Sequence, residues 1–393
     1  MTNHRTEGLL YDMTAPYSEP SSTGRRPDVT SLIIDLQSVG LRVEVPVEAR
    51  RGGAGPSDSG MLWIEGVAAT VPTDSRDSPY VLKAEDDGQG IYRDGVKLAS
   101  VANSHRPRFY DMTTADGVPY WKIALLHLDS LASTVLQTCN YWGNSDQCRF
   151  CGIGVSLDSG RTIAKKTPAQ LAEVAVAARD LDGAVDATLT TGSTRAPDRG
   201  AYYVAECGRA VKEASGLPVE VQFEPPHDLA VLDRVHGSGV DAVGIHVESF
   251  DPKVLAHVAP GKFRTGIETY FATWERAVEL WGPGRVSTYV ILGMGEDPDL
   301  TIAACKRAVE IGVYPFVVPL RPVAGSLMEE VAPPTAEYTE RVYRKVAGYL
   351  EERGIGADTA VAGCARCQAC SGINGLQNEL SGGKPLLQIG FRG

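Results

Sequence analysis

The sequence predicts an α/β protein whose main unit is a partial, six-unit barrel of alternating strands and helices. Apolar candidate strands lie at residues 132–137, 186–193, 218–225, 241–249, 285–293 and 314–322. Between them, segments with helical periodicity lie at 167–181, 201–216, 266–282 and 299–312, and several of these end in glycine. Strands that alternate with helices indicate βα units and a parallel sheet. Six units fall short of the eight of a complete barrel.

The regions before and after this alternation of strands and helices have other patterns, which divide the chain into four segments. Residues 1–27 are polar and rich in Pro, Ser and Thr, which predicts a mobile segment. Residues 28–125 alternate short apolar runs with turn-rich pieces and predict a small β-rich or α+β domain without a catalytic motif. Residues 126–335 form the expected barrel, and 336–393 a C-terminal helix followed by a cysteine-rich extension.

Composition narrows the possible partners and the expected location. The 393 residues carry a net charge of −11, so nonspecific binding to nucleic acid is not expected. No apolar run reaches the roughly 20 residues of a membrane span, which argues against a membrane partner. The N-terminal residues lack a hydrophobic signal core, so we expect a cytoplasmic protein.

Six of the eight cysteines stand in two tight groups, a pattern that favours metal ligation over disulfides in a cytoplasmic chain. The first group is Cys139, Cys148 and Cys151, directly after the first barrel strand. Because barrel active sites collect at the carboxyl ends of the strands, this group is expected at the catalytic face. Three thiolates suit a [4Fe–4S] cluster with one open iron, whereas structural zinc, the alternative, prefers four ligands.

Around these cysteines, roughly residues 126–330 resemble the radical S-adenosylmethionine (SAM) superfamily. That superfamily usually separates its three cysteines by three and then two residues, with an aromatic residue before the third. The "CRFC" half is present, with Phe150 in the aromatic position, but the first gap is eight residues long. A longer loop is tolerated at modest entropic cost.

Further motifs follow in the order in which the superfamily has them. The resemblance implies that "TLTTGST" binds the SAM amino group and that "GIHVESFDP" presents an acidic residue to the ribose hydroxyls, as in biotin and lipoyl synthases. It also implies that "VILGMGED" lies near the adenine and that "VVPLRPVAGS" points an arginine toward the substrate or the SAM carboxylate. The SAM-binding residues implied are Thr190, Thr191, Gly192, Ser193, Glu248, Ser249, Gly293, Gly295 and Arg321. His246, beside Glu248, is either a core residue or a catalyst.

The resemblance implies an enzyme that reductively cleaves SAM to a 5′-deoxyadenosyl radical. That radical abstracts hydrogen from a small-molecule or carrier-protein-bound substrate, and the electron comes from a donor such as flavodoxin or ferredoxin. The cofactors supply the difficult chemistry, so the lack of a Ser–His–Asp pattern is no obstacle. A rival hypothesis is a redox protein with two clusters and no SAM, which would need no pocket around Glu248.

The second group, Cys364, Cys367 and Cys370, follows the last predicted helix. Its tight spacing predicts an auxiliary iron–sulfur cluster, expected to be [4Fe–4S]; a zinc site is the alternative, but no histidine lies nearby in the sequence. Such a cluster could donate sulfide, bind substrate or accept an electron. The biotin and lipoyl synthase resemblance favours sulfur insertion, and hence a transferase.

Neither synthase family has this auxiliary cysteine pattern, and biotin synthase draws its auxiliary ligands from within the barrel. The region "NYWGNSDQCRFCGI" is also similar to uncharacterised radical SAM proteins of bacterial nitrilase-type gene clusters, a resemblance that implies no reaction. The remaining cysteines, Cys207 and Cys305, lie in predicted helices and are expected to be small buried hydrophobic residues.

Overall fold

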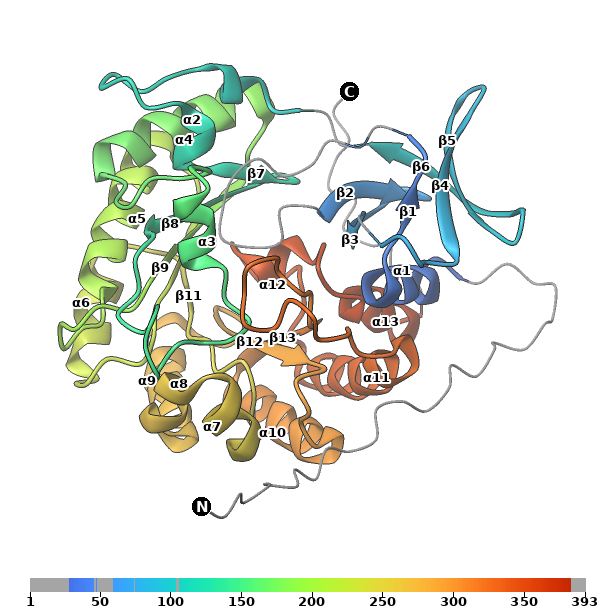
Figure 1. Ribbon diagram of the computed structural model, residues 1–393. Coiled ribbons are helices and arrows are strands. Elements are labelled where there is room, and N and C mark those ends of the chain that lie inside the picture. The colour runs from blue at the N-terminus through green and yellow to red at the C-terminus, as the bar shows by residue number, and fades with distance from the viewer. Residues whose placement is uncertain (1–27, 46, 48–58, 74, 104–105, 383–393) are drawn as a thin grey trace, which may run out of the picture.

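The computed structural model describes residues 28–45, 47, 59–73, 75–103 and 106–382, which form two sheets that lie next to each other (Figure 1). The segment 1–27, predicted to be mobile, and residues 383–393 of the cysteine-rich extension lie outside the described residues. Among the described helices, none combines the length and hydrophobicity that crossing a bilayer requires.

The larger sheet contains, within the described residues, seven strands in the order β13-β12-β11-β10-β9-β8-β7. All neighbours from β8 to β13 pair in parallel, whereas the edge strand β7 is antiparallel to β8. The strands are β7 (Leu125–His127), β8 (Ser130–Leu136), β9 (Asp186–Thr191), β10 (Val219–Gln222), β11 (Ala242–Gly244), β12 (Val286–Leu292) and β13 (Val313–Pro319).

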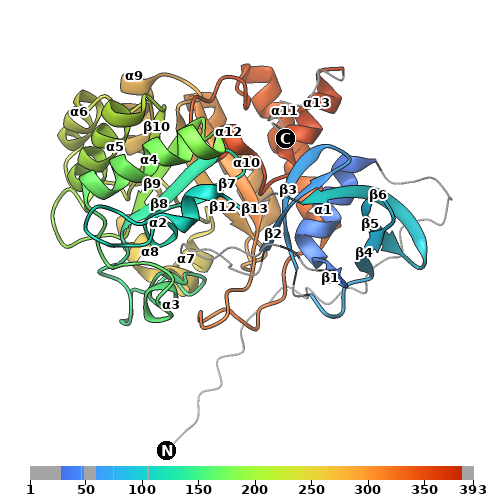
Figure 2. The same cartoon turned by 90° about the horizontal axis from the view of Figure 1, so that it is seen from above.

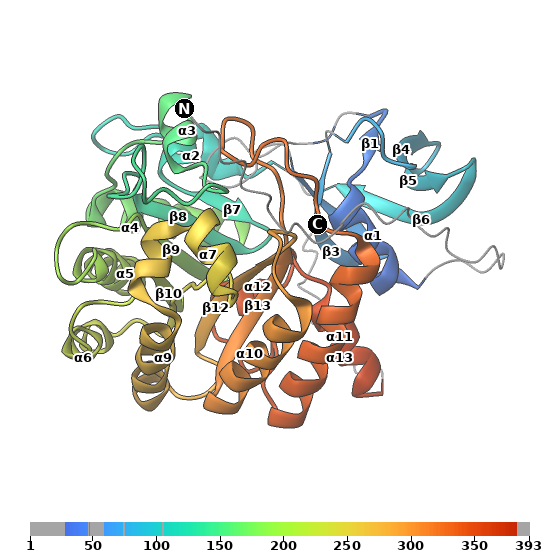
Figure 3. The same cartoon turned by 60° about the horizontal axis from the view of Figure 1, so that its bottom comes forward.

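Helices follow each parallel strand and cover the outer side of the sheet (Figure 3). They are α3 (Ile153–Asp158), α4 (Pro168–Asp182), α5 (Ala201–Ser215), α6 (Ala230–Gly237), α7 (Pro252–Val258), α8 (Pro260–Thr265), α9 (Ile267–Trp281), α10 (Pro298–Ile311) and α11 (Ala336–Arg353). The sequence sets their ends directly. At α4, the Thr167 hydroxyl accepts from the Gln170 N–H, Pro168 occupies the first turn, and Gly183 ends the helix at φ 69°.

The core between sheet and helices is apolar and continuous. Every residue of β13 is buried, and so is every residue of β10. Trp274, Tyr270 and Phe271 of α9 fill the space beneath the sheet with almost no exposed surface. The fold is therefore α/β with a curled, half-barrel sheet, as the sequence predicts. Its division into six β/α units remains a prediction.

The smaller sheet has the strand order β1-β4-β5-β6-β2-β3 and packs beside the barrel (Figure 2). Its elements are β1 (Arg42–Val43), β2 (Ser59–Ile64), β3 (Val67–Pro72), β4 (Tyr80–Glu85), β5 (Gly88–Arg93) and β6 (Val96–Asn103), with α1 (Val29–Val39) against it. The first apolar run forms α1 because Asp28 caps it through the Ser31 N–H and Leu32, Ile33 and Leu36 share its buried face. Two short helices, η1 (Arg108–Asp111) and α2 (Tyr120–Ile123), lead into the barrel.

The chain after α11 folds back onto the sheet rather than away from it. Helix α12 (Cys364–Cys367) contacts β13, and α13 (Ile373–Leu380) packs on α11. Arg366 pairs with Asp129 before β8 and with Asp186 of β9, and the Gln368 amide donates to the Tyr314 hydroxyl of β13 at 2.9 Å. The C-terminal cysteine segment therefore lies along the side of the larger sheet that faces away from α4, α5 and α9.

Candidate functional site

The carboxyl ends of the parallel strands bring the predicted site residues to one edge of the larger sheet. The loop with Cys139 follows β8, Gly192 follows β9 and Glu248 follows β11. Gly293 comes directly after β12. Parallel strands end at the same edge, so side chains that are distant in the sequence meet there.

Gly192 allows the end of β9 to pack directly against the first cysteine group. A Cβ at this position would lie 2.1 Å from the carbonyl oxygen of Thr138, the residue before Cys139. Two backbone hydrogen bonds join the segments: Gly192 N–H to the Leu136 carbonyl at 2.9 Å, and Asn140 N–H to the Ser193 carbonyl at 2.7 Å. Gly192 therefore lets one backbone segment approach another, and its implied part in SAM binding remains a prediction.

The thiols of Cys139, Cys148 and Cys151 lie close enough for their charges to interact. Burial raises the pKa of all three, that of Cys151 to about 11 and that of Cys148 well above its ordinary value. Phe150 packs into an apolar cluster with residues of α7 and with Met294. Three partly buried thiols that ionise unfavourably alone are suited to a cationic metal centre, which stabilises their thiolate forms.

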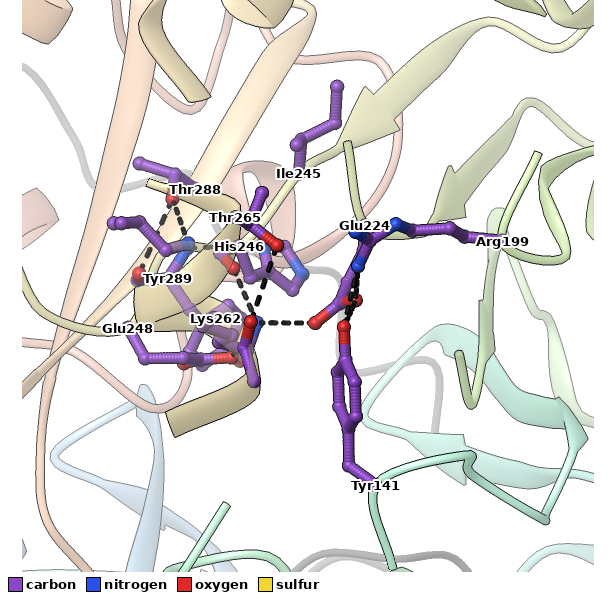
Figure 4. A network of polar contacts seen from close by, with 12 residues as sticks. Tyr141, Arg199, Glu224, Ile245, His246, Glu248, Lys262, Thr265, Thr288 and Tyr289 are labelled. Carbon is purple, nitrogen blue, oxygen red and sulfur yellow. Dashed lines mark hydrogen bonds and ion pairs between the residues drawn. The ribbon is translucent and has the colours of Figure 1, made fainter. Parts of the chain in front are cut away.

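Figure 4 shows a buried charge network, and the charge of its lysine acts on all three of these thiols. The Lys262 ammonium is 3.4 Å from the Glu248 carboxylate and 3.9 Å from that of Glu224, and it donates to the His246 carbonyl at 2.5 Å. All three charged side chains are at most 12% exposed. Burial raises the pKa of Glu248, and Lys262 opposes that shift. Burial alone would lower the pKa of Lys262, but its interactions with Tyr270 and the two carboxylates outweigh burial and raise it well above its ordinary value.

Glu224 joins this network to the cysteine loop. Its carboxylate accepts from the Arg199 guanidinium at 2.8 Å and from the Tyr141 hydroxyl at 3.0 Å, and Arg199 also donates to the Tyr141 oxygen at 2.6 Å. Tyr141 is two residues after Cys139. The network fixes the loop, and its two carboxylates and two cations balance in charge.

His246 is a neutral imidazole, and one of its two ring nitrogens has no hydrogen-bond partner among the described residues. Its Nδ1 accepts the Tyr289 backbone N–H at 3.1 Å, so the proton of the neutral ring is on Nε2. Burial, together with the charge of Lys262, lowers the pKa of His246 to about 3. No described residue offers Nε2 a hydrogen-bond partner, although this atom is buried. A buried, unpaired donor is costly, and a bound ligand with an acceptor would satisfy it.

Predicted residues also lie at the end of β9 and in the segment after β11. Thr190 and Thr191 end β9, and the Thr191 hydroxyl donates to the Gly192 carbonyl at 3.1 Å. Ser249 accepts from the Asp251 N–H at 3.2 Å, in the cap of α7.

After β12 the predicted "GMGE" turn is held by its own glutamate. The Glu296 carboxylate accepts from the N–H groups of Gly293 and Met294, both at 2.8 Å. Gly293 and Gly295 have φ of 93° and 98°, a region that only glycine enters freely. A Cβ on Gly293 would also lie 2.6 Å from Pro334. The turn is therefore defined by backbone geometry, and the residue after it, Asp297, caps the start of α10.

The second cysteine group has a partner that its sequence neighbourhood does not contain. His127, at the end of β7, has Nδ1 3.4 Å from Cys367 Sγ and Nε2 3.8 Å from Cys370 Sγ. Cys364 Sγ accepts from the Tyr289 hydroxyl at 3.1 Å. Burial alone would raise the pKa of the Cys370 thiol, but the charge and hydrogen bond of His127 lower it to about 6.

Tyr289 contacts both His246 and the second cysteine group. Its backbone N–H and its ring contact His246, with ring centroids 5.0 Å apart, while its hydroxyl reaches Cys364. It lies on β12, between the carboxyl-end site and the C-terminal segment.

Arg321 lies nearer the second group than the sequence prediction implied. Its guanidinium donates to the Thr70 carbonyl at 2.6 Å, and its charge acts on Cys370. Its predicted role toward substrate or the SAM carboxylate remains a prediction. In the described part of the chain, no set of three or more His, Cys, Asp or Glu side chains is arranged to hold a single metal ion.

The sequence analysis did not predict several residues of these two sites. Glu224 could have been found, since a carboxylate directly after a buried strand stands where barrel site residues stand. Lys262, Arg199 and Tyr141 lie on helices and loops, where an isolated charge or hydroxyl gives no periodic signal. His127 is a lone histidine on a short strand, far in sequence from the cysteines it contacts.

Part of the larger unit matches a known family. Residues 138–308 match the radical SAM superfamily. The matched segment includes the first cysteine group, Gly192, the buried charge network and the "GMGE" turn. That family implies a [4Fe–4S] cluster and SAM, and the three partly buried thiols and the unpaired Nε2 of His246 are compatible with both.

Among similar proteins, the bacteriochlorophyllide c C-7(1)-hydroxylase of Chlorobaculum limnaeum is 29% identical over 133 residues, a third of each chain. Methylornithine synthase has 16% identity and a TM-score of 0.44, covering 58% of this chain and 63% of its own. A radical SAM methyltransferase from Sphaerobacter thermophilus has 17% identity and a TM-score of 0.44, covering 77% and 82%. The match to the curated hydroxylase thus spans about a third of that protein's length.

Proposed function

We propose that the protein is a radical SAM enzyme that reductively cleaves SAM and abstracts hydrogen from a small-molecule or carrier-bound substrate. The observation that supports this most directly is the contact between the cysteine loop and Gly192, with the Glu248–Lys262 network beside both. A [4Fe–4S] cluster held by Cys139, Cys148 and Cys151 would supply the electron for SAM cleavage.

Within this proposal the chain's own residues bind and orient. Glu248 is placed to accept two hydroxyl hydrogen bonds from a ribose, and the charge of Lys262 opposes the rise that burial gives the pKa of that carboxyl group. His246 presents a neutral Nε2–H donor to the bound ligand. Arg199 and Tyr141 fix Glu224 and the cysteine loop, so that the site is rigid before ligand arrives.

For the C-terminal group we propose an auxiliary iron–sulfur cluster on Cys364, Cys367 and Cys370. The sequence prediction assumed that a C-terminal triplet lies outside the barrel, unlike the auxiliary ligands of biotin synthase. Contacts of α12 with β9, β12 and β13 remove that objection, because the triplet returns to the sheet. Sulfur insertion of the biotin and lipoyl synthase type therefore remains our first proposal for the reaction.

A second candidate reaction is oxidation of the substrate, with the auxiliary cluster as electron acceptor. Similarity to a hydroxylase over 133 residues favours it. So does Tyr289, which contacts both His246 beside the first site and Cys364 of the second cysteine group. As before, we expect flavodoxin or ferredoxin to supply the first electron, and a cytoplasmic location.

The test is anaerobic incubation of reconstituted protein with SAM and dithionite, scoring 5′-deoxyadenosine and methionine. Cys148→Ala should abolish both products, whereas Cys305→Ala, a cysteine buried in α10, should leave them unchanged. Replacing the three C-terminal cysteines with alanine should leave SAM cleavage measurable. Cluster formation without any SAM cleavage in the unaltered protein would instead favour a plain iron–sulfur redox protein.

A further inference from the structure

We propose that His127 is the fourth protein ligand of the metal centre formed by Cys364, Cys367 and Cys370. This inference rests on the proposed auxiliary site and completes it. The imidazole nitrogens of His127 lie 3.4 Å from Cys367 Sγ and 3.8 Å from Cys370 Sγ, so one side chain faces two of the three thiols. A Cys₃His donor set is an established metal-binding combination.

The backbone around His127 holds the imidazole in this position. His127 ends β7 and pairs with Ser130 of β8 across a tight turn, where Leu128 has φ of 58°. The Leu128 N–H contacts Met61 Sδ of β2 at 3.3 Å. The turn is thus held from both sheets, and the half-buried imidazole lies between them, facing the cysteine segment. A pre-positioned ring is what a metal ligand requires.

Thr70 supplies the support that a ligating histidine needs. Its hydroxyl lies 3.1 Å from His127 Nε2. Thr70 is itself fixed, because its N–H donates to the Ala369 carbonyl at 2.8 Å and its carbonyl accepts from Arg321 at 2.6 Å. Ligating histidines almost always donate the remaining ring N–H to an oxygen acceptor. With Nε2–H directed at Thr70, the lone pair of Nδ1 is left for the metal, on the side of Cys367.

The chemistry of the centre follows from this ligand set. A fourth protein ligand closes the coordination, so substrate cannot bind through an open iron at this centre. Histidine in place of a thiolate also removes one negative charge and raises the reduction potential of iron–sulfur centres. Both consequences favour a centre that receives an electron over one that anchors substrate.

The test isolates this centre in the full-length chain by replacing Cys139, Cys148 and Cys151 with alanine. After anaerobic reconstitution we expect about four iron atoms per chain. The reduced centre should show a histidine nitrogen hyperfine coupling that shifts with ¹⁵N-histidine labelling. His127→Ala should abolish this coupling, and the exposed-histidine control His227→Ala should retain it. Thr70→Val should release iron to a chelator about 10- to 100-fold faster.

The possible failures are distinguishable. Iron bound without nitrogen coupling, or coupling that survives His127→Ala, overturns the ligand assignment and leaves the auxiliary cluster standing. One tightly bound zinc per chain, weakened by His127→Ala, supports the ligand assignment but overturns the iron–sulfur part of the proposed function. No metal at all overturns both. Cleavage of SAM by the unaltered protein is scored separately, so the primary proposal does not depend on this result.

Discussion

Gly192→Ala is the change that most directly tests how the first site is built. The backbone of Gly192 is not in the glycine-only region, so alanine is acceptable conformationally and only space is lacking. The new Cβ would lie 2.1 Å from the Thr138 carbonyl oxygen, whereas ordinary contacts begin at 3.4 Å. Relief therefore requires a displacement of about 1.3 Å, which falls on the backbone next to Cys139.

A shift of that size is large for a reacting centre. Misplacement by about 1 Å is enough to lower a catalysed rate by about 100-fold, and overpacking typically costs about 1–3 kcal/mol of stability. We therefore expect Gly192→Ala to reduce the rate of 5′-deoxyadenosine formation by about two orders of magnitude. Iron bound by the C-terminal group should not change, because neither α12 nor His127 contacts this segment in the interactions described above.

Gly348→Ala is the matched control. Gly348 lies within α11, and a Cβ there meets no atom within 4 Å. Alanine is favoured over glycine in a helix by about 1 kcal/mol, so this variant should be slightly more stable and equally active. The measurement compares the single-turnover rate of 5′-deoxyadenosine formation in the two variants at equal iron content. Equal rates for the two variants would refute the close packing of β9 against the cysteine loop as the organising contact.

Three further outcomes are expected. Lys262→Met should lower the free energy of unfolding by about 3–5 kcal/mol, because it leaves Glu224 and Glu248 buried without their cation. In a double-mutant cycle measured by urea unfolding, Lys262→Met combined with Glu248→Gln should lose less stability than the two single variants lose together. Glu248→Gln alone should raise the KM for SAM about 10- to 100-fold, whereas the exposed Glu279→Gln should not; unchanged SAM kinetics would contradict the ribose role. Burial lowers the pKa of Lys166 to about 7 from its ordinary 10.5, so folding releases a proton from this side chain between those pH values. The contribution of Lys166 to the free energy of unfolding should therefore rise with pH in that range, by up to about 1.4 kcal/mol per pH unit. Urea titrations at pH 7 and pH 9 should show that Lys166→Met removes this slope.

The sequence predicts most of the larger sheet because its signals are local. Each strand is a short apolar run, each helix has a cap such as Thr167 or a terminal glycine such as Gly183, and both are readable within a few residues. The positions that follow the strands, Cys139 and Glu248 among them, could be predicted to meet because parallel strands end at one edge. For this reason the expected strand segments overlap β8 to β13, although the segment expected at 241–249 contains only the short strand Ala242–Gly244.

The rest of the site depends on pairings between distant elements, which no local pattern encodes. Lys262 is a lone lysine in a short helix, and only the fold places it between two carboxylates. His127 and Cys367 are 240 positions apart, so the spacing rules that mark a metal site within a loop cannot link them. The absence of a histidine near the C-terminal cysteines in sequence was therefore a poor reason to set zinc aside.

The role of the N-terminal domain, which its composition leaves open, follows from the same long-range contacts. Thr70 of β3 bonds to the Ala369 carbonyl through its backbone and to His127 through its hydroxyl, and the Gln37 amide of α1 donates to that carbonyl at 3.0 Å. The small sheet thus forms one wall of the C-terminal cysteine site rather than a separate appendage. Because each of these bonds joins the N-terminal domain to β7 or to the C-terminal cysteine segment, loosening the domain should disturb the second cysteine group before the first. We then expect binding of a partner to the small sheet to act on the proposed auxiliary centre, without direct contact with the proposed SAM site.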